Sequence, residues 1–203
     1  MLEFLRSGGW LMLPILACSV ISLAIIIERS LALRRSVVTP PGLSADIDRS
    51  IAQGRLDPDR IAALRRSSAL GHVLAVGLAT AQSDPIRIQE AVEEAGRHVV
   101  HGLERYLNAL GTIAATTPLL GLLGTVIGMI KVFAAITTSG VGDPQVLAGG
   151  IYEALITTAA GLSIGIPSLM FHRYFRGRIN ELTVEIEQQA LRLLDLLRQR
   201  NLR

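Results

Sequence analysis

The chain has 203 residues, of which 50% are hydrophobic and only 18% are charged. This composition is too apolar for an ordinary soluble domain and favours an integral membrane protein. The formal net charge is +3, but aromatic residues make up only 4% of the chain, so we expect no nucleic-acid partner. The single cysteine, Cys18, excludes an intramolecular disulfide and a multi-thiolate metal site.

The first apolar segment covers residues 9–29, after a short N-terminus at residues 1–8. Arg6, the apolar run and Cys18 together look loosely like a lipoprotein signal in which the cysteine would be acylated. The apolar run continues well past Cys18, whereas a cleaved signal gives way to a polar mature sequence. We therefore predict an uncleaved transmembrane helix at 9–29, with Pro14 as a tolerated kink and the cysteine as a packing residue.

Two further apolar segments, 109–136 and 146–171, are long enough to cross the hydrocarbon core of a bilayer as helices. The turn between them, 137–145, is rich in glycine. Within it, Asp143 is the expected N-cap and Pro144 the expected first residue of the next helix. The sequence therefore predicts three transmembrane helices joined by one long and one short connection.

Basic residues predict the orientation of these segments. Arginines are concentrated in two stretches, 30–108 and 172–203, whereas the 137–145 turn has none. Basic loops stay on the cytoplasmic side of a membrane. We therefore expect both arginine-rich stretches inside the cell, and the N-terminus and the short turn outside it.

The long cytoplasmic connection is expected to be helical. Ser44 and Asp57 are the predicted N-caps of two helices, and Asp84-Pro85 places a proline at the start of another. No helix breaker follows Pro85 until Pro118, which lies inside an apolar span where a kink is tolerated. We expect one helix of about 50 residues from Pro85 into the second transmembrane segment.

The third transmembrane helix is expected to continue without a break into the C-terminal tail. Apolar residues recur at helical spacing along that tail. They are Leu182, Ile186, Leu193 and Leu197. Such a stripe is typical of a packing seam between helices or between subunits.

One carboxylate, Glu153, lies within the third apolar segment. A charge inside a membrane helix is costly, so it commonly faces a bundle interior or a watery cavity and has a function there. The alternative is a structural or snorkelling carboxylate near the outer boundary. Thr157 lies four residues on and shares the face of Glu153, whereas Thr158 lies about 140° around the helix.

The second apolar segment carries Gly121, Thr125 and Gly128 on one helical face. Close packing of membrane helices is the interpretation that this spacing favours. A narrow polar lining, with the hydroxyl of Thr125 offered to water or an ion, is the alternative.

No pattern in the chain is typical of an enzyme. Glu94, His98 and His101 form a helical trio of the kind that charged helix surfaces often produce, and we expect no metal there. The Gly121–Gly124 segment has no lysine and lies in an apolar span, so it is not a phosphate-binding loop. We therefore expect no catalytic residue and no cofactor.

Two motifs resemble a known family. Residues 118–129, PLLGLLGTVIGM, followed by Phe133, resemble the second-span motif of the MotA/TolQ/ExbB proton-channel family. Residues 150–162, GIYEALITTAAGL, followed by Ile166-Pro167, resemble its third-span motif. The expected topology, with three spans and a large inner loop, also fits that family.

The resemblance implies a fold and a set of partners. The fold is that of an all-α integral membrane protein, with three transmembrane helices and long helices extending into the cytoplasm. The family implies a homopentamer in the bacterial inner membrane, surrounded by lipids. A pair of single-span subunits of the ExbD/TolR/MotB type would lie inside it, each contributing one membrane aspartate as the proton carrier.

The resemblance also implies roles for individual residues. Thr125 and Thr158 match the polar residues that line the channel, and Glu153 matches the acidic residue of the third span. Position in the motif thus favours Thr158, whereas the helical face favours Thr157, and both stay candidates. The motif residues expected at helix packing near the pore are Pro118, Gly121, Gly124, Gly128, Gly161 and Pro167.

Within the family, the ExbB branch resembles the chain most. This implies a stator that couples the proton motive force to outer-membrane transport through a TonB-like protein. A TolQ-like role in the Tol-Pal envelope system is the alternative, because many TolQ members carry the same third-span glutamate. A purely structural membrane scaffold is a further alternative.

Overall fold

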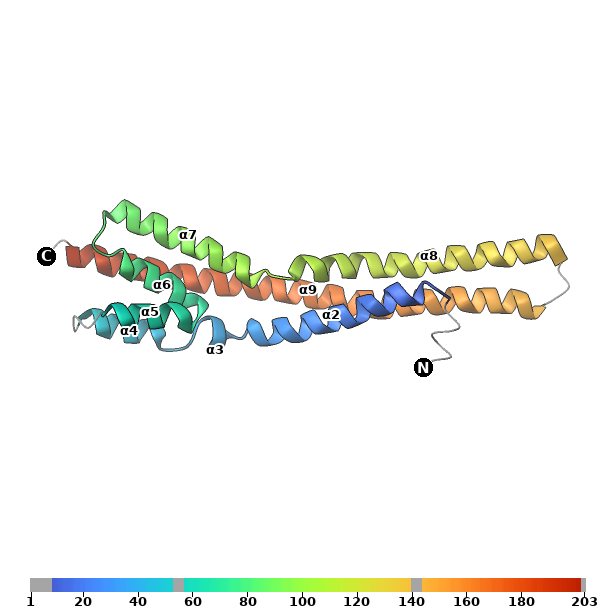
Figure 1. Ribbon diagram of the computed structural model, residues 1–203, viewed down its shortest axis with the longest axis horizontal. Coiled ribbons are helices and arrows are strands. Elements are labelled where there is room, and N and C mark those ends of the chain that lie inside the picture. The colour runs from blue at the N-terminus through green and yellow to red at the C-terminus, as the bar shows by residue number, and fades with distance from the viewer. Residues whose placement is uncertain (1–8, 53–56, 140–143, 202–203) are drawn as a thin grey trace. The chain divides into compact units, whose positions relative to one another are not determined.

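The computed structural model describes residues 9–52, 57–139 and 144–201. All regular secondary structure in these residues is helical, with no strand among them (Figure 1). In chain order, the helices are α2 (Met12–Ala32), α3 (Arg35–Val38), α4 (Leu43–Ala52), α5 (Pro58–Ser67), α6 (Ala69–Ala79), α7 (Pro85–Leu103), α8 (Leu107–Ser139) and α9 (Pro144–Asn201).

The helices form two compact units. The first comprises Met1–Glu28 and Tyr106–Tyr174, and the second comprises Arg29–Arg105 and Phe175–Arg203. The first unit therefore takes most of α2, all of α8 and the 144–174 part of α9. The second takes the last residues of α2, all of α3 to α7 and the remainder of α9.

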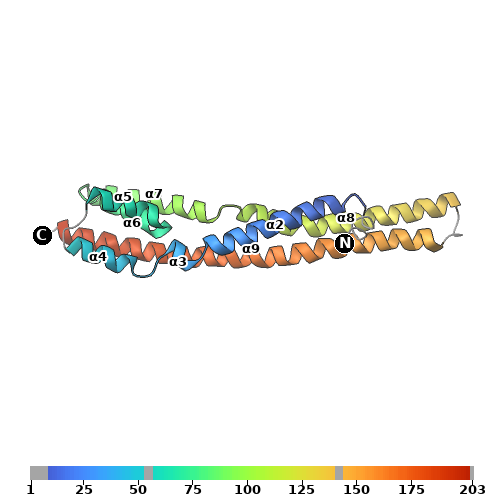
Figure 2. The ribbon, with the colours of Figure 1, turned by 60° about the horizontal axis from the view of Figure 1, so that its bottom comes forward.

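In the first unit, α2, α8 and the N-terminal part of α9 run side by side (Figures 1 and 2). A buried hydrogen bond of 2.6 Å joins Ser22 Oγ of α2 to Ser168 Oγ of α9. Three helical stretches are long and apolar enough to cross a membrane. They are Met12–Ala32, Pro85–Thr137, which includes the short turn between α7 and α8, and Leu147–Gln199.

Large apolar side chains are exposed on all three helices of the first unit. The most exposed include Leu13, Val20, Leu23, Leu119, Ile130, Phe133, Leu155 and Met170, each at 59% or more. So many exposed apolar side chains are unfavourable in water, whereas lipid tails or neighbouring subunits would cover them. The first unit is therefore the membrane part of an all-α protein.

In the second unit, α6 is the buried centre. Its apolar side chains, Leu70, Val73, Leu74, Ala75 and Leu78, are 5% exposed or less. A Cβ added at Gly77 would lie 3.0 Å from Leu193 Cδ2 of α9 and 3.1 Å from Val92 Cγ2 of α7. The helix α6 is thus held between α7 and α9.

The apolar stripe of the C-terminal tail faces this core. Leu182, Ile186, Leu193 and Leu197 are all 3% exposed or less. The prediction of a packing seam is confirmed, and the seam packs within the chain. The prediction that α9 continues unbroken from the third apolar segment into the tail is also confirmed.

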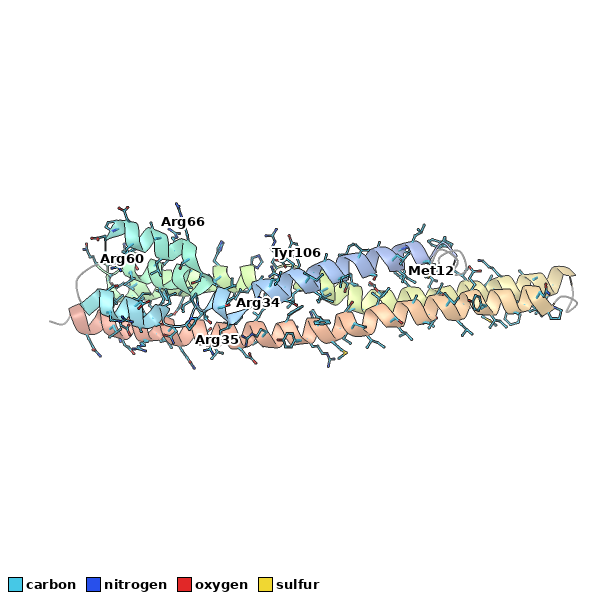
Figure 3. All side chains as sticks on the ribbon, turned by 90° about the horizontal axis from the view of Figure 1, so that it is seen from below. Met12, Arg34, Arg35, Arg60, Arg66 and Tyr106 are labelled. Atoms are coloured by element: carbon cyan, nitrogen blue, oxygen red, sulfur yellow. The ribbon has the colours of Figure 1, made fainter. Side chains whose placement is uncertain are left out.

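Two ion pairs join the N-terminal helices of the second unit to α9. Arg35, the first residue of α3 (Figure 3), lies with Nη2 2.6 Å from Glu185 Oε1. This hydrogen-bonded carboxylate raises the pKa of the Arg35 guanidinium above its ordinary value. Arg192 Nη2 of α9 lies 2.6 Å from Asp48 Oδ2 of α4.

Proline begins three helices where the sequence predicts it. Pro58, Pro85 and Pro144 are the first residues of α5, α7 and α9, because proline has no N–H to leave unpaired in a first turn. The N-cap prediction at Ser44 is wrong, since α4 already begins at Leu43. The N-cap prediction at Asp143 lies outside the described residues.

The prediction of one long helix from Pro85 is also wrong. The helix α7 ends at Leu103, and α8 begins at Leu107 after a turn. In that turn, Tyr106 (labelled in Figure 3) has a φ of 63°, in the left-handed region that interrupts a right-handed helix. Its carbonyl oxygen then accepts from the N–H of Leu110 at 3.0 Å and so restarts the helical pattern.

The first transmembrane helix begins later than the sequence predicts. Residues Gly9–Leu11 form a turn, in which the Met12 N–H donates to the Gly9 carbonyl oxygen at 3.2 Å. Gly9 itself has a φ of 67°, which a residue with a Cβ adopts only under strain. The helix α2 then runs from Met12 to Ala32, against the predicted 9–29.

Candidate functional site

The candidate site lies between α8 and α9 of the first unit, where glycines bring the two backbones together. A Cβ added at Gly121 would lie 3.0 Å from Thr157 O and 3.3 Å from Gly161 Cα. A Cβ added at Gly161 would lie 2.7 Å from Thr117 O. The distance of 2.7 Å is too short for a real Cβ, and those of 3.0 and 3.3 Å are tighter than most real Cβ contacts. This crossing therefore depends on glycine, as is common between membrane helices.

The close contact continues toward the end of α8. A Cβ added at Gly124 would overlap the Thr157 side chain, and one added at Gly128 would lie 2.8 Å from Ala154 Cβ. On the other helix, a Cβ added at Gly150 would lie 2.5 Å from Val132 Cγ2. We call these contacts, from Gly121–Gly161 to Val132–Gly150, the glycine seam.

Pro118 lies just beyond the Gly121–Gly161 end of the seam. A Cβ added at Gly165 would overlap the ring of Pro118. Proline cannot donate a backbone hydrogen bond to the residue four positions earlier, so its place in α8 locally weakens the helix. Pro167, in contrast, is exposed, so of the two prolines only Pro118 packs between α8 and α9, next to the glycine seam.

Thr157 is enclosed by the seam. Its side chain is 1% exposed, and its hydroxyl donates to the carbonyl oxygen of Ala154 at 2.8 Å. The carbonyl oxygen of Glu153, one turn earlier, lies 3.2 Å from the same hydroxyl. The hydroxyl is therefore satisfied within its own helix, which is the ordinary arrangement of a threonine in a membrane helix.

Thr158 makes a bond between the two helices. Its hydroxyl donates to the carbonyl oxygen of Gly121 at 2.8 Å, and its side chain is half-buried. This carbonyl belongs to the helix across the seam, so the bond ties α9 to α8. The structure therefore brings Thr158 together with Gly121, and Thr157 together with Gly124.

Thr125 is half-buried on α8. Its hydroxyl donates to the carbonyl oxygen of Leu122 in its own helix at 2.7 Å. A hydroxyl that donates in this way keeps acceptor lone pairs on its oxygen. Thr125 and Thr158 both therefore retain the capacity to accept a hydrogen bond from another group.

Glu153 is half-buried at the far end of the seam from Pro118. Its Oε1 lies 2.7 Å from the Nζ of Lys131 on α8, and the two side chains are 24% and 52% exposed. A Cβ added at Gly9 would overlap the same carboxylate oxygen, so the turn before α2 also reaches it. Three elements therefore meet at this carboxylate.

The sequence did not single out Lys131 as a partner of Glu153. The two residues are 22 positions apart, so no local spacing connects them. The signal available was the single basic residue at the end of the second apolar segment. Ser22 and Ser168 were missed for the same reason, because they lie in different helices and 146 positions apart.

Comparison with known proteins relates this site to a family. Residues 65–188 match the model of the MotA/TolQ/ExbB proton channel family. The chain is 33% identical over 174 residues to the biopolymer transport protein ExbB-like 1 of Synechocystis sp., an alignment covering 84% of this chain and 68% of that protein. It is 30% identical over 191 residues to the ExbB homolog of Methanothermobacter thermautotrophicus, covering 92% and 66%.

A shorter match relates the chain to a second branch. It is 38% identical over 81 residues to the Tol-Pal system protein TolQ of Haemophilus influenzae, covering 40% of this chain and 36% of that protein. The chain spans about two thirds of the length of the Synechocystis and Methanothermobacter relatives.

The family match covers α6, α7 and α8 and most of α9, and so includes both helices of the glycine seam. The helices and the comparisons together describe a multi-pass membrane protein. The chain belongs to the MotA/TolQ/ExbB proton channel family and is most like its ExbB members.

Proposed function

We propose that the chain is an ExbB-like subunit of a proton-driven stator in the bacterial inner membrane. It would couple the proton motive force to TonB-dependent outer-membrane transport. Family membership and the longer matches to ExbB-type proteins support this function. The observation that carries the proposal is Glu153, a half-buried carboxylate in a helix apolar enough to span a membrane.

The proposed roles follow from the chemistry of the side chains. Glu153 sets the charge and hydration at its end of the α8–α9 pair. Thr125 and Thr158 accept hydrogen bonds from a partner's protonated carboxyl group, since both hydroxyls already donate elsewhere. Thr157 is the alternative to Thr158, although its burial leaves its hydroxyl less accessible from outside the pair.

A proton pathway needs a second acidic group from another chain. Glu153 is the sole carboxylate in the 146–171 segment. We propose that the second acid is the membrane aspartate of an ExbD-type single-span subunit, held within a homopentamer of this chain. The exposed apolar surface of the first unit supports such an assembly, which would cover part of it.

The proposed orientation rests on the arginines. The stretches 30–108 and 172–203 would lie in the cytoplasm, and the N-terminus and the 137–145 turn in the periplasm. The carboxylate of Glu153 would then lie toward the periplasmic end of its helix, where protons enter.

A TolQ-like role in the Tol-Pal system is the second candidate, supported by the match to TolQ of Haemophilus influenzae. A complementation experiment distinguishes the ExbB role from the TolQ role. The chain and its own single-span partner are expressed in a host lacking its ExbB and TolQ proteins. Recovery of TonB-dependent uptake supports the ExbB role, and recovery of detergent resistance alone supports the TolQ role.

The same assay tests the alternative that the chain is a purely structural membrane scaffold. Under our proposal, Glu153→Gln abolishes the recovery, whereas Glu181→Gln, an exposed glutamate elsewhere on α9, preserves it. A Glu153→Gln chain that restores uptake as well as the unaltered chain contradicts a proton-pathway role and supports the scaffold.

A further inference from the structure

We propose that Lys131 is a specificity-determining residue: a tethered counter-cation that keeps metal cations off Glu153. The inference rests on the proposed function of Glu153 in a proton pathway. It starts from the ion pair of 2.7 Å between Lys131 Nζ and Glu153 Oε1, which joins α8 to α9.

The glycine seam fixes the position of this pair. Val132 follows Lys131 and packs against Gly150, while Ala154 follows Glu153 and packs against Gly128. Each member of the ion pair is therefore the immediate neighbour of a residue that packs against a glycine of the other helix. Neither helix can slide or rotate without breaking these contacts, so the register that brings ammonium to carboxylate is held.

The carboxylate oxygen is enclosed from a second side. The turn at Gly9 lies so close to Glu153 Oε1 that a Cβ on the glycine would overlap it. The same oxygen that accepts from Lys131 is thus shielded by the backbone before α2. A free cation approaching Oε1 has to displace both the ammonium and this turn.

The charge of the pair decides which ions the site favours. Unpaired acidic side chains around a pore attract cations and are a common basis of cation selectivity. The ammonium of Lys131 neutralises that charge locally, which removes the attraction for Na⁺. A proton, which travels on water molecules and hydroxyl groups, needs no coordination shell at the carboxylate and is not excluded in this way.

A lysine near the end of a membrane helix also has a simpler role, in which its stem follows the helix and its head reaches the lipid headgroups. The two roles make different predictions. A snorkelling lysine acts independently of Glu153, whereas a counter-cation has no effect on selectivity once the carboxylate is gone. A double-mutant cycle separates them.

The first test detects the pair in the membrane. The full chain in liposomes is treated with a water-soluble carbodiimide, which activates Glu153 so that Lys131 can attack it and form an amide. The chain loses one water, which the reagent takes up as a urea. Mass spectrometry is expected to find a peptide cross-link between the two residues. Modification of Glu153 by the reagent with no cross-link overturns the proposal.

The second test measures selectivity in proteoliposomes that contain the chain with its single-span partner. Na⁺ uptake is followed with radioactive sodium, and proton uptake with an entrapped pH indicator. Lys131→Met removes the charge at similar volume and is expected to raise Na⁺ uptake about fivefold, the effect that a half-exposed ion pair supports. Lys131→Arg is expected to match the unaltered chain.

In a chain that already carries Glu153→Gln, adding Lys131→Met is expected to leave Na⁺ uptake the same as with Glu153→Gln alone. Unchanged Na⁺ uptake in the Lys131→Met chain, or an equal rise in both backgrounds, overturns the inference. Failure of the proposed function would give a different result, in which the unaltered complex conducts no protons. The cross-link and the Na⁺ uptake of the variants would then still show whether Lys131 pairs with Glu153.

Discussion

The hydroxyl of Thr158 donates a hydrogen bond of 2.8 Å to the carbonyl oxygen of Gly121, across the interface of α9 and α8. This carbonyl is accessible because Gly121 has no side chain and lies directly against Gly161. Thr158, for which we propose a place in the channel lining, is thus also a tie between the two helices that form the seam.

Thr158→Val removes this tie at nearly constant volume. We expect a loss of about 0.5–1 kcal/mol in the stability of the membrane part, which is typical of a hydrogen bond between membrane helices. Unfolding of the purified chain in detergent measures it. Ser163→Ala is the matched control, because that exposed hydroxyl bonds only within α9, to Ala159. Equal stability of the Thr158→Val and unaltered chains would contradict the role of the bond.

Gly161→Ala tests the part of the seam where the backbones of α8 and α9 face one another directly. The new Cβ would lie 2.7 Å from the Thr117 carbonyl oxygen, which is backbone and cannot rotate away. We expect destabilisation of about 1–3 kcal/mol from this overpacking, despite the better helix propensity of alanine. Thermal unfolding in detergent checks it.

Gly149→Ala is the control for that substitution. Gly149 lies in the same helix with nothing within 4 Å of the added Cβ. The unfolding temperature of the Gly149→Ala chain is therefore expected to stay the same or rise. Equal losses at the two glycines would show that the effect belongs to helix α9 in general and not to its contact with α8.

The serine pair between α2 and α9 predicts that removing one hydroxyl destabilises the chain more than removing the other. Ser168 donates its only hydroxyl proton to the Ile164 carbonyl oxygen at 2.7 Å, so Ser22 is the donor in the bond of 2.6 Å between them. Ser168→Ala leaves the buried Ser22 hydroxyl without this acceptor, whereas Ser22→Ala leaves Ser168 satisfied. We expect Ser168→Ala to destabilise the chain more, with a difference of about 1 kcal/mol.

Chemical unfolding of both serine variants and of the double variant provides the measurement. The double variant is expected to be no less stable than Ser168→Ala alone, because no donor is then left unpaired. A Ser22→Ala chain that loses more than the Ser168→Ala chain would reverse the assigned donor.

In the second unit, two nearby leucines of α9 are expected to contribute very differently to stability. Leu193 is 3% exposed and packs against α6 at Gly77, whereas Leu191 is 62% exposed. Leu193→Ala is expected to cost about 2–5 kcal/mol through the cavity that it leaves. Leu191→Ala is expected to change the stability by less than about 0.5 kcal/mol. Limited proteolysis of the full chain at increasing temperature compares the two.

Much of the helical organisation could be predicted from local sequence. Pro58, Pro85 and Pro144 begin helices because proline suits a first turn, and Leu182 and Leu193 are buried because helical periodicity places them on one face. These features depend on residues within a few positions of one another. They are therefore visible before any tertiary contact is known.

The break before α8 was not predictable in the same way. No glycine or proline occupies residues 104–106, and tyrosine at a φ of 63° runs against its local preference. The surrounding structure, and not the local sequence, sets this conformation. The interruption also coincides with the boundary of the two units, at Arg105 and Tyr106.

The sequence singles out the candidate residues Glu153, Thr157 and Thr158 one by one, but it does not give their arrangement in space. Helical angles separate Thr157 from Thr158, yet they do not tell which one faces α8. The structure brings both to the seam, one buried against Gly124 and one bonded to Gly121. The partner of Glu153 depends on how α8 and α9 align, which no spacing within either helix contains.

Proton uptake into proteoliposomes tests the central claim most directly. The chain and its single-span partner are reconstituted, a potassium diffusion potential drives the flux, and an entrapped indicator records the pH. We expect uptake above that of empty vesicles for the unaltered complex and for Glu181→Gln, and a loss of that uptake for Glu153→Gln with the complex still assembled. Uptake that is the same with and without the Glu153 carboxylate would contradict its place in a proton pathway.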